Sequence, residues 1–218
     1  ANHFVPDILP ELWPDEVDPI ALQDAKARAI GLLQMAATLE ATGEVVNGEL
    51  HLNVTVTNET AHKLPSGYPE GRRIWLNVRA FDGQEQLVYE SGAYDPATGI
   101  LTHDEDAKVY EIKPGISYGL ADALGLEAGP SFHFALNDTV WSDNRIPPRG
   151  FTNAGFEAIQ SQPVAYDYAD GQYHDLTVYP LPAGAARAEV ALYYQTTSKE
   201  YVEFLRDENV TDQQGQQL

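Results

Sequence analysis

The sequence predicts a mainly β fold: an antiparallel β-sandwich or jelly-roll-like domain with an N-terminal arm, a long helix and a short C-terminal helix. Three observations lead to this prediction. Apolar and polar residues alternate with a period of two in about eight short runs between residues 45 and 196. Glycine and proline turn signals separate these runs, and a helical period occurs only near the two ends. Short strands joined by such turns build sandwiches and jelly rolls.

The first 17 residues are expected to form an extended arm. Pro6, Pro10 and Pro14 each lack a backbone donor and restrict the residue before them. Several apolar residues lie between these prolines, so we expect the arm to dock on another surface.

A helix is expected from Asp18 to Leu39. Asp18 is a favourable N-cap, Pro19 suits the first helical position, and Gly43 is the expected C-cap glycine. One apolar stripe at helical spacing predicts that the helix packs on the rest of the protein. The stripe consists of Ile20, Ala25, Ala29, Leu32, Leu33, Ala36 and Leu39.

The strands follow from residue 45 onward. Asn47-Gly48 predicts a type I′ hairpin turn, and the alternation at Leu50, Leu52, Val54 and Val56 predicts a half-buried strand. The expected strands are 50–57, 74–81, 86–90, 108–112, 131–136, 139–141, 173–179 and 187–196. The last strand is expected to turn Ala188, Val190, Leu192 and Tyr194 to one face.

A second helix is expected after these strands. Thr197 to Glu200 fits a capping box, and apolar residues follow it at 201–205. The tail from Thr211 is expected to fray. The chain is therefore divided into an N-terminal arm and amphipathic helix, residues 1–42, and a β-sandwich domain with its C-terminal helix, residues 43–218.

Composition excludes several classes of function. The net charge of −20 over 218 residues argues against binding nucleic acid or anionic membranes. The absence of cysteine excludes disulfides, thiolate metal sites, a cysteine nucleophile and covalent haem attachment through Cys-x-x-Cys-His. No apolar run approaches the ~20 residues that span a bilayer, so no transmembrane segment is expected. The oligomeric state stays open.

Motifs of known enzymes are missing, so we expect a non-enzymatic protein. There is no glycine-rich phosphate loop, no His-Glu-x-x-His and no Gly-x-Ser-x-Gly. The six histidines show no metal-binding spacing. Asp95, Asp104 and Asp106 are weak candidates for calcium ligands, but a solvated acidic loop is the favoured interpretation.

Two long segments between strands are unusual in composition. Residues 58–76 and 137–153 both contain paired glycines or prolines and, between them, four of the eight arginines. Fixed polar loops of this kind are typical of functional or interaction surfaces. The alternative, given equal weight, is that the arginines tie the loops to carbonyl groups and carboxylates within the chain.

These segments carry a family resemblance. Residues 62–76, 88–95, 143–153 and 193–201 resemble the non-haem C-terminal region of large bacterial multihaem c-type cytochromes. The resemblance implies an extracytoplasmic protein, periplasmic or extracellular, that supports electron transfer. It also implies a multihaem cytochrome subunit or haem domain as partner, because this cysteine-free chain cannot hold haem c covalently.

The resemblance also suggests two residues that approach a partner's haem. Asn2-His3-Phe4-Val5 is similar to segments that supply a distal imidazole in multihaem cytochromes. His62 stands in a His-x-x-Pro-Ser-Gly context similar to loops that approach haems in the same proteins. We therefore expect His3 and His62 to be candidates for cofactor binding, with haem c of a partner chain as the cofactor.

Two alternatives remain open. One is an extracellular carbohydrate- or ligand-binding module, in which Trp75, Trp141 and the tyrosines stack on sugars. A concave face with exposed aromatic residues would favour it, and burial of both tryptophans would weaken it. The less favoured alternative is a metal-dependent enzyme, which would need three histidines to converge on one ion.

Overall fold

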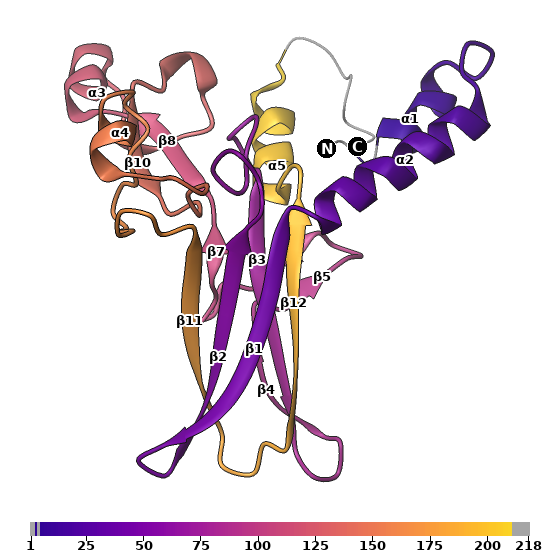
Figure 1. Ribbon diagram of the computed structural model, residues 1–218. Helices are drawn as coiled ribbons and strands as arrows, with labels where there is room; N and C mark the ends of the chain where they lie inside the picture. Colours follow the sequence, from indigo (N-terminus) through magenta and orange to yellow (C-terminus); the bar gives the residue numbers. More distant parts are fainter. Residues whose placement is uncertain (1–2, 4, 211–218) are drawn as a thin grey trace.

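The computed structural model describes His3 and residues 5–210, and its strands dominate the centre of the molecule (Figure 1). The helices are α1 Val5–Leu12, α2 Pro19–Gln34, α3 Tyr118–Leu124, the 3-10 helix η1 Phe134–Leu136, α4 Asn153–Glu157 and α5 Lys199–Glu208. The strands are β1 Ala37–Val46, β2 Glu49–Asn58, β3 Arg73–Phe81, β4 Leu87–Ser91, β5 Tyr94–Asp95, β6 Ile100–Leu101, β7 Val109–Tyr110, β8 Ile112–Ile116, β9 Gly129–Pro130, β10 Thr139–Asp143, β11 His174–Leu181 and β12 Arg187–Gln195.

Two antiparallel sheets form the sandwich. One has the strand order β1-β2-β11, and the other has the order β12-β3-β4 with β7 also paired to β3. A smaller sheet, β10-β8-β9, lies beside them and carries α3 and α4 nearby (Figure 1). The predicted mainly β fold with antiparallel sheets, N-terminal helices and a C-terminal helix is confirmed.

The core lies between the two large sheets. Residues of β2 and β3 that alternate along each strand meet there, as the period of two requires. The buried members are Leu52, Val54 and Val56 from β2, Ile74, Leu76 and Val78 from β3, Tyr179, Tyr110, Leu64 and Ile146. The predicted inward face of β12 is confirmed, because Ala188, Val190, Leu192 and Tyr194 pack against this cluster.

The helix expected to reach Leu39 ends earlier. α2 stops at Gln34, and β1 already begins at Ala37 and pairs with β2 over its whole length. Gly43 caps no helix, because it lies inside β1 opposite Leu52. The alternating Thr38, Leu39 and Glu40 sequence is compatible with a strand, and pairing with β2 decides the outcome.

Two further expectations were wrong. The arm is not extended throughout, because Val5–Leu12 forms α1. Its Pro6 sits in the first turn, where the missing N–H has no helical partner in any case. The segment 131–136 is not a strand, because it contains the 3-10 helix η1, and the short strand β9 precedes it.

Other local predictions hold. Asn47 and Gly48 both have positive φ and connect β1 to β2 as the hairpin turn requires. α5 begins near the predicted capping box, but its N-cap is Ser198, whose hydroxyl accepts a hydrogen bond from the Tyr201 N–H at 3.2 Å. The division of the chain at residues 42 and 43 stays a prediction. The tail from Thr211 lies outside the described residues.

The two N-terminal helices form a hairpin that extends from the body of the sandwich (Figure 1). The ammonium group of Lys26 in α2 donates to Asp7 in α1 at 2.6 Å. None of the residues of α2 is buried, so the expected docking of its whole apolar stripe on the protein was wrong. Ile20, Leu32 and the following Met35 are 76%, 60% and 66% exposed. Among the described helices, none combines the length and apolar character needed to cross a bilayer.

Candidate functional site

The two unusual loops of the sequence lie side by side and are hydrogen-bonded to each other. Leu64 and Ile146 exchange backbone hydrogen bonds of 2.9 and 3.0 Å. The buried side-chain amide of Asn58 donates to the carbonyl oxygens of His62, Ile146 and Pro147 at 2.8, 2.9 and 3.0 Å. One residue at the end of β2 therefore fixes both loops, although they are far apart in the sequence.

A buried group of charges holds the same two loops. The carboxylate of Asp143 accepts from the ammonium group of Lys63 at 2.7 Å and from the guanidinium of Arg145 at 2.7 and 2.9 Å. Burial alone would raise the pKa of Asp143, but the hydrogen bonds and positive charges of Arg145 and Lys63 outweigh it and lower this pKa. Asp143 therefore stays ionised at the centre of the loop pair.

The arginines of the two loops all have internal partners. Arg72 donates to the carbonyl oxygen of Ser66 at 2.8 Å, and Arg73 donates from Nε to the Gln195 side chain at 2.8 Å. Arg149 pairs with Glu59 at 2.9 Å on the surface. Together with Arg145, these contacts confirm that the arginines tie the loops to the chain.

His62 lies on the surface of this fixed loop. Its Nδ1 is 3.1 Å from the Thr60 hydroxyl and 3.3 Å from the carbonyl oxygen of Lys63, and its Nε2 is 3.4 Å from the Ser66 hydroxyl. The imidazole is exposed and is held by its Nδ1 side. This arrangement leaves Nε2 with one long polar contact in the described residues, so this nitrogen is suited to a further ligand.

A cleft of about 380 Å³ opens next to His62. The end of α2, the start of β1, strand β12 and the loop of His62 form its walls. Most of the lining is apolar. It includes Leu32, Leu33, Ile74 and Tyr194 in addition to His62. We call this feature the His62 cleft.

His3 is also near this region. Its ring lies 6.2 Å from the ring of Tyr194, which lines the His62 cleft. The structure therefore brings His3 close to a residue of the cleft, although the two histidines are far apart in the sequence. The neighbouring residues 1, 2 and 4 lie outside the described part of the chain.

The three candidate calcium ligands have other partners. Asp104 accepts from the Ser91 hydroxyl and the Gly92 N–H at 2.8 and 2.7 Å, and Asp106 accepts from the Tyr89 hydroxyl at 2.8 Å. Asp95 closes its own turn by accepting from the Thr98 hydroxyl. In residues 5–210 and His3, no three metal-ligating side chains form a group that could hold an ion. We therefore do not propose a calcium site or a metal-dependent enzyme.

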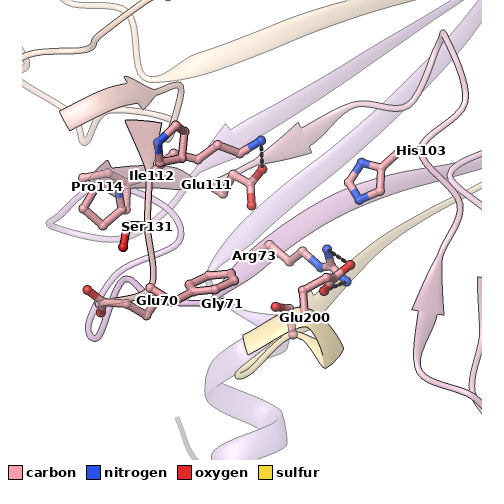
Figure 2. Close-up of a pocket in the computed structure, with 13 residues that line it drawn as sticks. Glu70, Gly71, Arg73, His103, Glu111, Ile112, Pro114, Ser131 and Glu200 are labelled. Carbon is pink, nitrogen blue, oxygen red and sulfur yellow. Dashed lines mark hydrogen bonds and ion pairs between the residues drawn. The ribbon is translucent and has the colours of Figure 1, made fainter. Parts of the chain in front are cut away.

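A second cleft, of about 280 Å³, lies where the first loop meets α5 (Figure 2). Two ion pairs line it: Arg73 with Glu200 at 3.3 Å and Lys113 with Glu111 at 3.0 Å. Burial opposes ionisation of Glu200, but local hydrogen bonds and the charge of Arg73 lower its pKa. Glu70 also lines this cleft, and its carboxylate is buried with no hydrogen-bond partner at Oε2 among the described residues. The two ion pairs therefore compensate the charges of this cleft only in part.

Gly71 permits this close approach to α5. Its φ is +70°, and a Cβ at this position would lie 2.7 Å from the Cβ of Tyr201 and 3.0 Å from the backbone nitrogen of Ser198. Any side chain at residue 71 would therefore push the loop away from the helix.

Sequence reasoning missed one buried polar network. Asp175 in β11 accepts from the hydroxyls of Tyr110 and Tyr166 at 2.9 and 2.7 Å and pairs with Lys108 at 2.9 Å. Burial and the Asp175 charge raise the pKa of Tyr110, so its hydroxyl remains a donor. These residues are spread over 68 positions of the sequence, and no motif or periodic pattern links them.

Comparison with known structures adds to this geometry. The crystal structure of a penta-heme cytochrome c552 from Thermochromatium tepidum matches with a TM-score of 0.53 and 16% sequence identity. The match covers 84% of this chain. The fold resembles part of a multihaem cytochrome c. The chain spans 37% of the length of that cytochrome. No protein-family model matches the sequence, and the comparison with curated proteins found no match.

The cytochrome-like fold occurs here without the means of covalent haem attachment. With no cysteine in 218 residues, the chain has no Cys-x-x-Cys-His segment. The chain therefore has a fold that resembles part of a multihaem cytochrome but no haem-attachment motif.

Proposed function

We propose that this chain is a non-catalytic, extracytoplasmic module that packs against the haem-bearing part of a multihaem c-type cytochrome and supports electron transfer there. The observation that carries the proposal is the His62 cleft, in which an exposed imidazole stands at the rim of an apolar hollow. The fold similarity over 84% of the chain supports the choice of partner.

The docking surface combines the cleft with the helical hairpin. Leu32 and Leu33 of α2 line the cleft, so the C-terminal end of the hairpin forms part of it. Ile20 and Met35, near the two ends of α2, are further apolar residues exposed on the hairpin. An unpartnered apolar surface of this kind marks an interface, and a haem edge with its surrounding apolar residues is a complementary partner.

His62 fits the role of an axial ligand to a partner's haem. An imidazole that is hydrogen-bonded through one nitrogen has a fixed ring orientation and a more basic second nitrogen. The contacts of Nδ1 with Thr60 and Lys63 would orient the ring in this way, and the apolar walls of the cleft would limit the access of water to a haem bound there. His3, beside Tyr194, is a second candidate on the same side of the protein.

The first experiment identifies the partner. The chain is purified with its native neighbours, and the complex is examined on a haem-stained gel and by absorbance. We expect a co-purifying polypeptide with covalently bound haem. A stable complex without any haem polypeptide would contradict the proposal.

The second experiment tests His62. In the reconstituted complex, His62→Ala should change the Soret and near-infrared bands of one haem and shift its midpoint potential. His174→Ala is the matched control, because His174 is also exposed but lies in β11, away from the lining of the cleft. Identical spectra for both variants would exclude ligation by His62 without excluding the complex itself.

A further inference from the structure

The outer face of the β12-β3-β4 sheet contains a hollow, and the register of β12 against β3 determines which side chains surround it. Tyr193 lies opposite Trp75, Ala191 opposite Asn77, and Glu189 opposite Arg79. The alternate residues Leu76 and Val78 are in the core, so these pairs face outward. The pair of small residues, Ala191 and Asn77, lies between the aromatic pair Tyr193–Trp75 and the charged pair Glu189–Arg79. The cleft on this face has a volume of about 470 Å³.

The aromatic end presents one accessible ring. Tyr193 is 45% exposed, and its ring packs 5.4 Å from that of Trp75. Trp75 is only 2% exposed and donates from its indole nitrogen to the carbonyl oxygen of Gly92 at 3.2 Å. The ring of Tyr94 also packs against Trp75, with 5.3 Å between the ring centroids. The buried indole is therefore a support that fixes Tyr193, and it is not itself the stacking platform.

The charged end offers both donors and acceptors. Arg79 pairs with Glu189 in β12 and lies opposite Glu90 in β4. The side-chain amide of Asn77 donates to Glu90 at 3.1 Å, which holds this carboxylate in place. The side chain of Arg79 is 45% exposed and Glu90 is also at the surface, so both can bind hydroxyl groups.

These chemistries suit one class of ligand. A sugar ring has an apolar C–H face that stacks on a tyrosine and hydroxyl groups that bind arginine and carboxylate side chains. An anionic ligand would meet Glu90, Glu189 and a protein of net charge −20. A fully apolar ligand would remove water from the exposed Arg79 and Glu90 groups without offering hydrogen bonds in its place. We propose that this hollow binds a neutral saccharide, with one ring stacked on Tyr193 and its hydroxyl groups bound by Arg79 and Glu90.

The test uses the purified chain alone, because Tyr193 also lines the His62 cleft, where a docked partner would compete with the ligand. Cellotriose, maltotriose, mannotriose and xylotriose are titrated while protein NMR signals and calorimetric heats are recorded. We expect saturable binding of at least one of them with a Kd of about 0.1–1 mM, as is usual for a single stacked ring. Absence of saturable binding by all four would overturn the proposal.

Variants locate the binding. Tyr193→Ala should abolish it, Tyr193→Phe should retain it, and Glu90→Gln should weaken it about fivefold to tenfold. Tyr118→Ala is the matched control, because Tyr118 is 75% exposed and lies on α3 outside the hollow. Unchanged binding in both Tyr193→Ala and Glu90→Gln would place the sugar elsewhere and contradict the assignment. Because Glu90 is exposed, Glu90→Gln remains informative if Tyr193→Ala fails to fold.

Discussion

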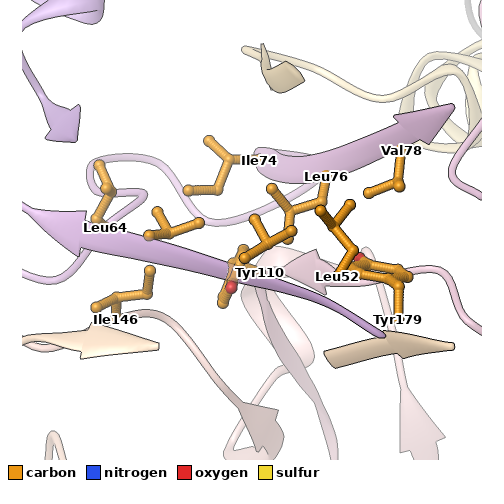
Figure 3. Packing of buried hydrophobic residues seen from close by; sticks show 10 residues of the cluster. Leu52, Leu64, Ile74, Leu76, Val78, Tyr110, Ile146 and Tyr179 are labelled. Atoms are coloured by element: carbon orange, nitrogen blue, oxygen red, sulfur yellow. The ribbon is translucent and has the colours of Figure 1, made fainter. Parts of the chain in front are cut away.

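The β-sandwich and the α1–α2 hairpin differ in what covers their apolar side chains. In the sandwich, Leu76 and Val78 lie between the two large sheets (Figure 3). Both residues and Val54 are fully buried. In the hairpin, Ile20 and Leu32 face outward although α2 is a well-capped helix. The two sheets of the sandwich thus cover the core between them, whereas the described part of the chain leaves these apolar side chains of the hairpin exposed.

The same contrast applies to charges. Asp143, Lys63 and Arg145 are buried together and hold the loops of the sandwich. The ion pair of the hairpin, Lys26 with Asp7, is largely exposed. Buried charges depend strongly on their partners, whereas exposed pairs contribute little to stability.

The largest effect is expected at the buried carboxylate. Asp143→Asn leaves the charges of Lys63 and Arg145 buried without their counter-ion, which should lower the free energy of unfolding by about 3–5 kcal/mol. Urea denaturation followed by circular dichroism measures this change. Asp122→Asn on exposed α3 is the control and should change it by less than about 0.5 kcal/mol. Equal effects of both substitutions would show that the Asp143 group does not hold the loops.

Substitution of one leucine in the core and of one in the hairpin compares the two regions directly. Leu76→Ala creates a cavity in the sandwich and should lower the free energy of unfolding by about 2–5 kcal/mol. Leu32→Ala at a 60% exposed position should change it by less than about 0.5 kcal/mol in the isolated chain. If Leu32→Ala were as destabilising as Leu76→Ala, the hairpin would not be the uncovered surface described here.

Acid should weaken the sandwich through its paired carboxylates. The pKa of Asp143 is lowered in the folded protein, so its ionised form stabilises the fold above the unfolded pKa of about 3.9. This stabilisation is lost as the pH falls through the lower, folded pKa. The free energy of unfolding should therefore decrease below about pH 4, and less steeply in Asp143→Asn. A slope that is the same in both proteins would contradict the role of Asp143.

The smallest expected effect comes from removing the N-cap of α5 or that of α2. Ser198 caps α5 and is 3% exposed, so Ser198→Ala should lower the global free energy of unfolding by about 1 kcal/mol. Asp18 caps α2 by accepting from the Ile20 N–H at 2.9 Å. Asp18→Ala should reduce helicity without moving the denaturation midpoint, because α2 is not part of the sandwich. A shift of the midpoint in Asp18→Ala would show that the two regions unfold together.

Sequence reasoning recovered the strands whose side chains alternate. Leu52, Val54 and Val56 in β2 and the inner face of β12 were predicted because a period of two is a local property. The start of β1 was not predicted, because residues 35–43 suit a helix as well as a strand. Pairing with residues 52–58 of β2 decides between them, and this information lies elsewhere in the chain.

The site was predicted in part for the same reason. The composition of residues 58–76 singled out the loop of His62, but it did not reveal that Asp143 is the partner of Lys63, 80 residues away. The outer-face hollow was also hidden, since it arises from the register of β3 against β12. Candidate residues could therefore be predicted where the sequence pattern is local. The residues that contact them from distant parts of the chain could not be predicted.

Hydrogen–deuterium exchange of the chain, alone and in complex with its haem-bearing partner, tests the central claim most directly. The isolated chain should exchange rapidly in residues 5–34 and slowly in β2 and β3, where the backbone is buried in the sandwich. In the complex, new protection should appear in α2 and in residues 60–66 around His62. Protection confined to other surfaces, or unchanged exchange in the hairpin, would contradict the proposal that the hairpin and the His62 cleft form the docking surface.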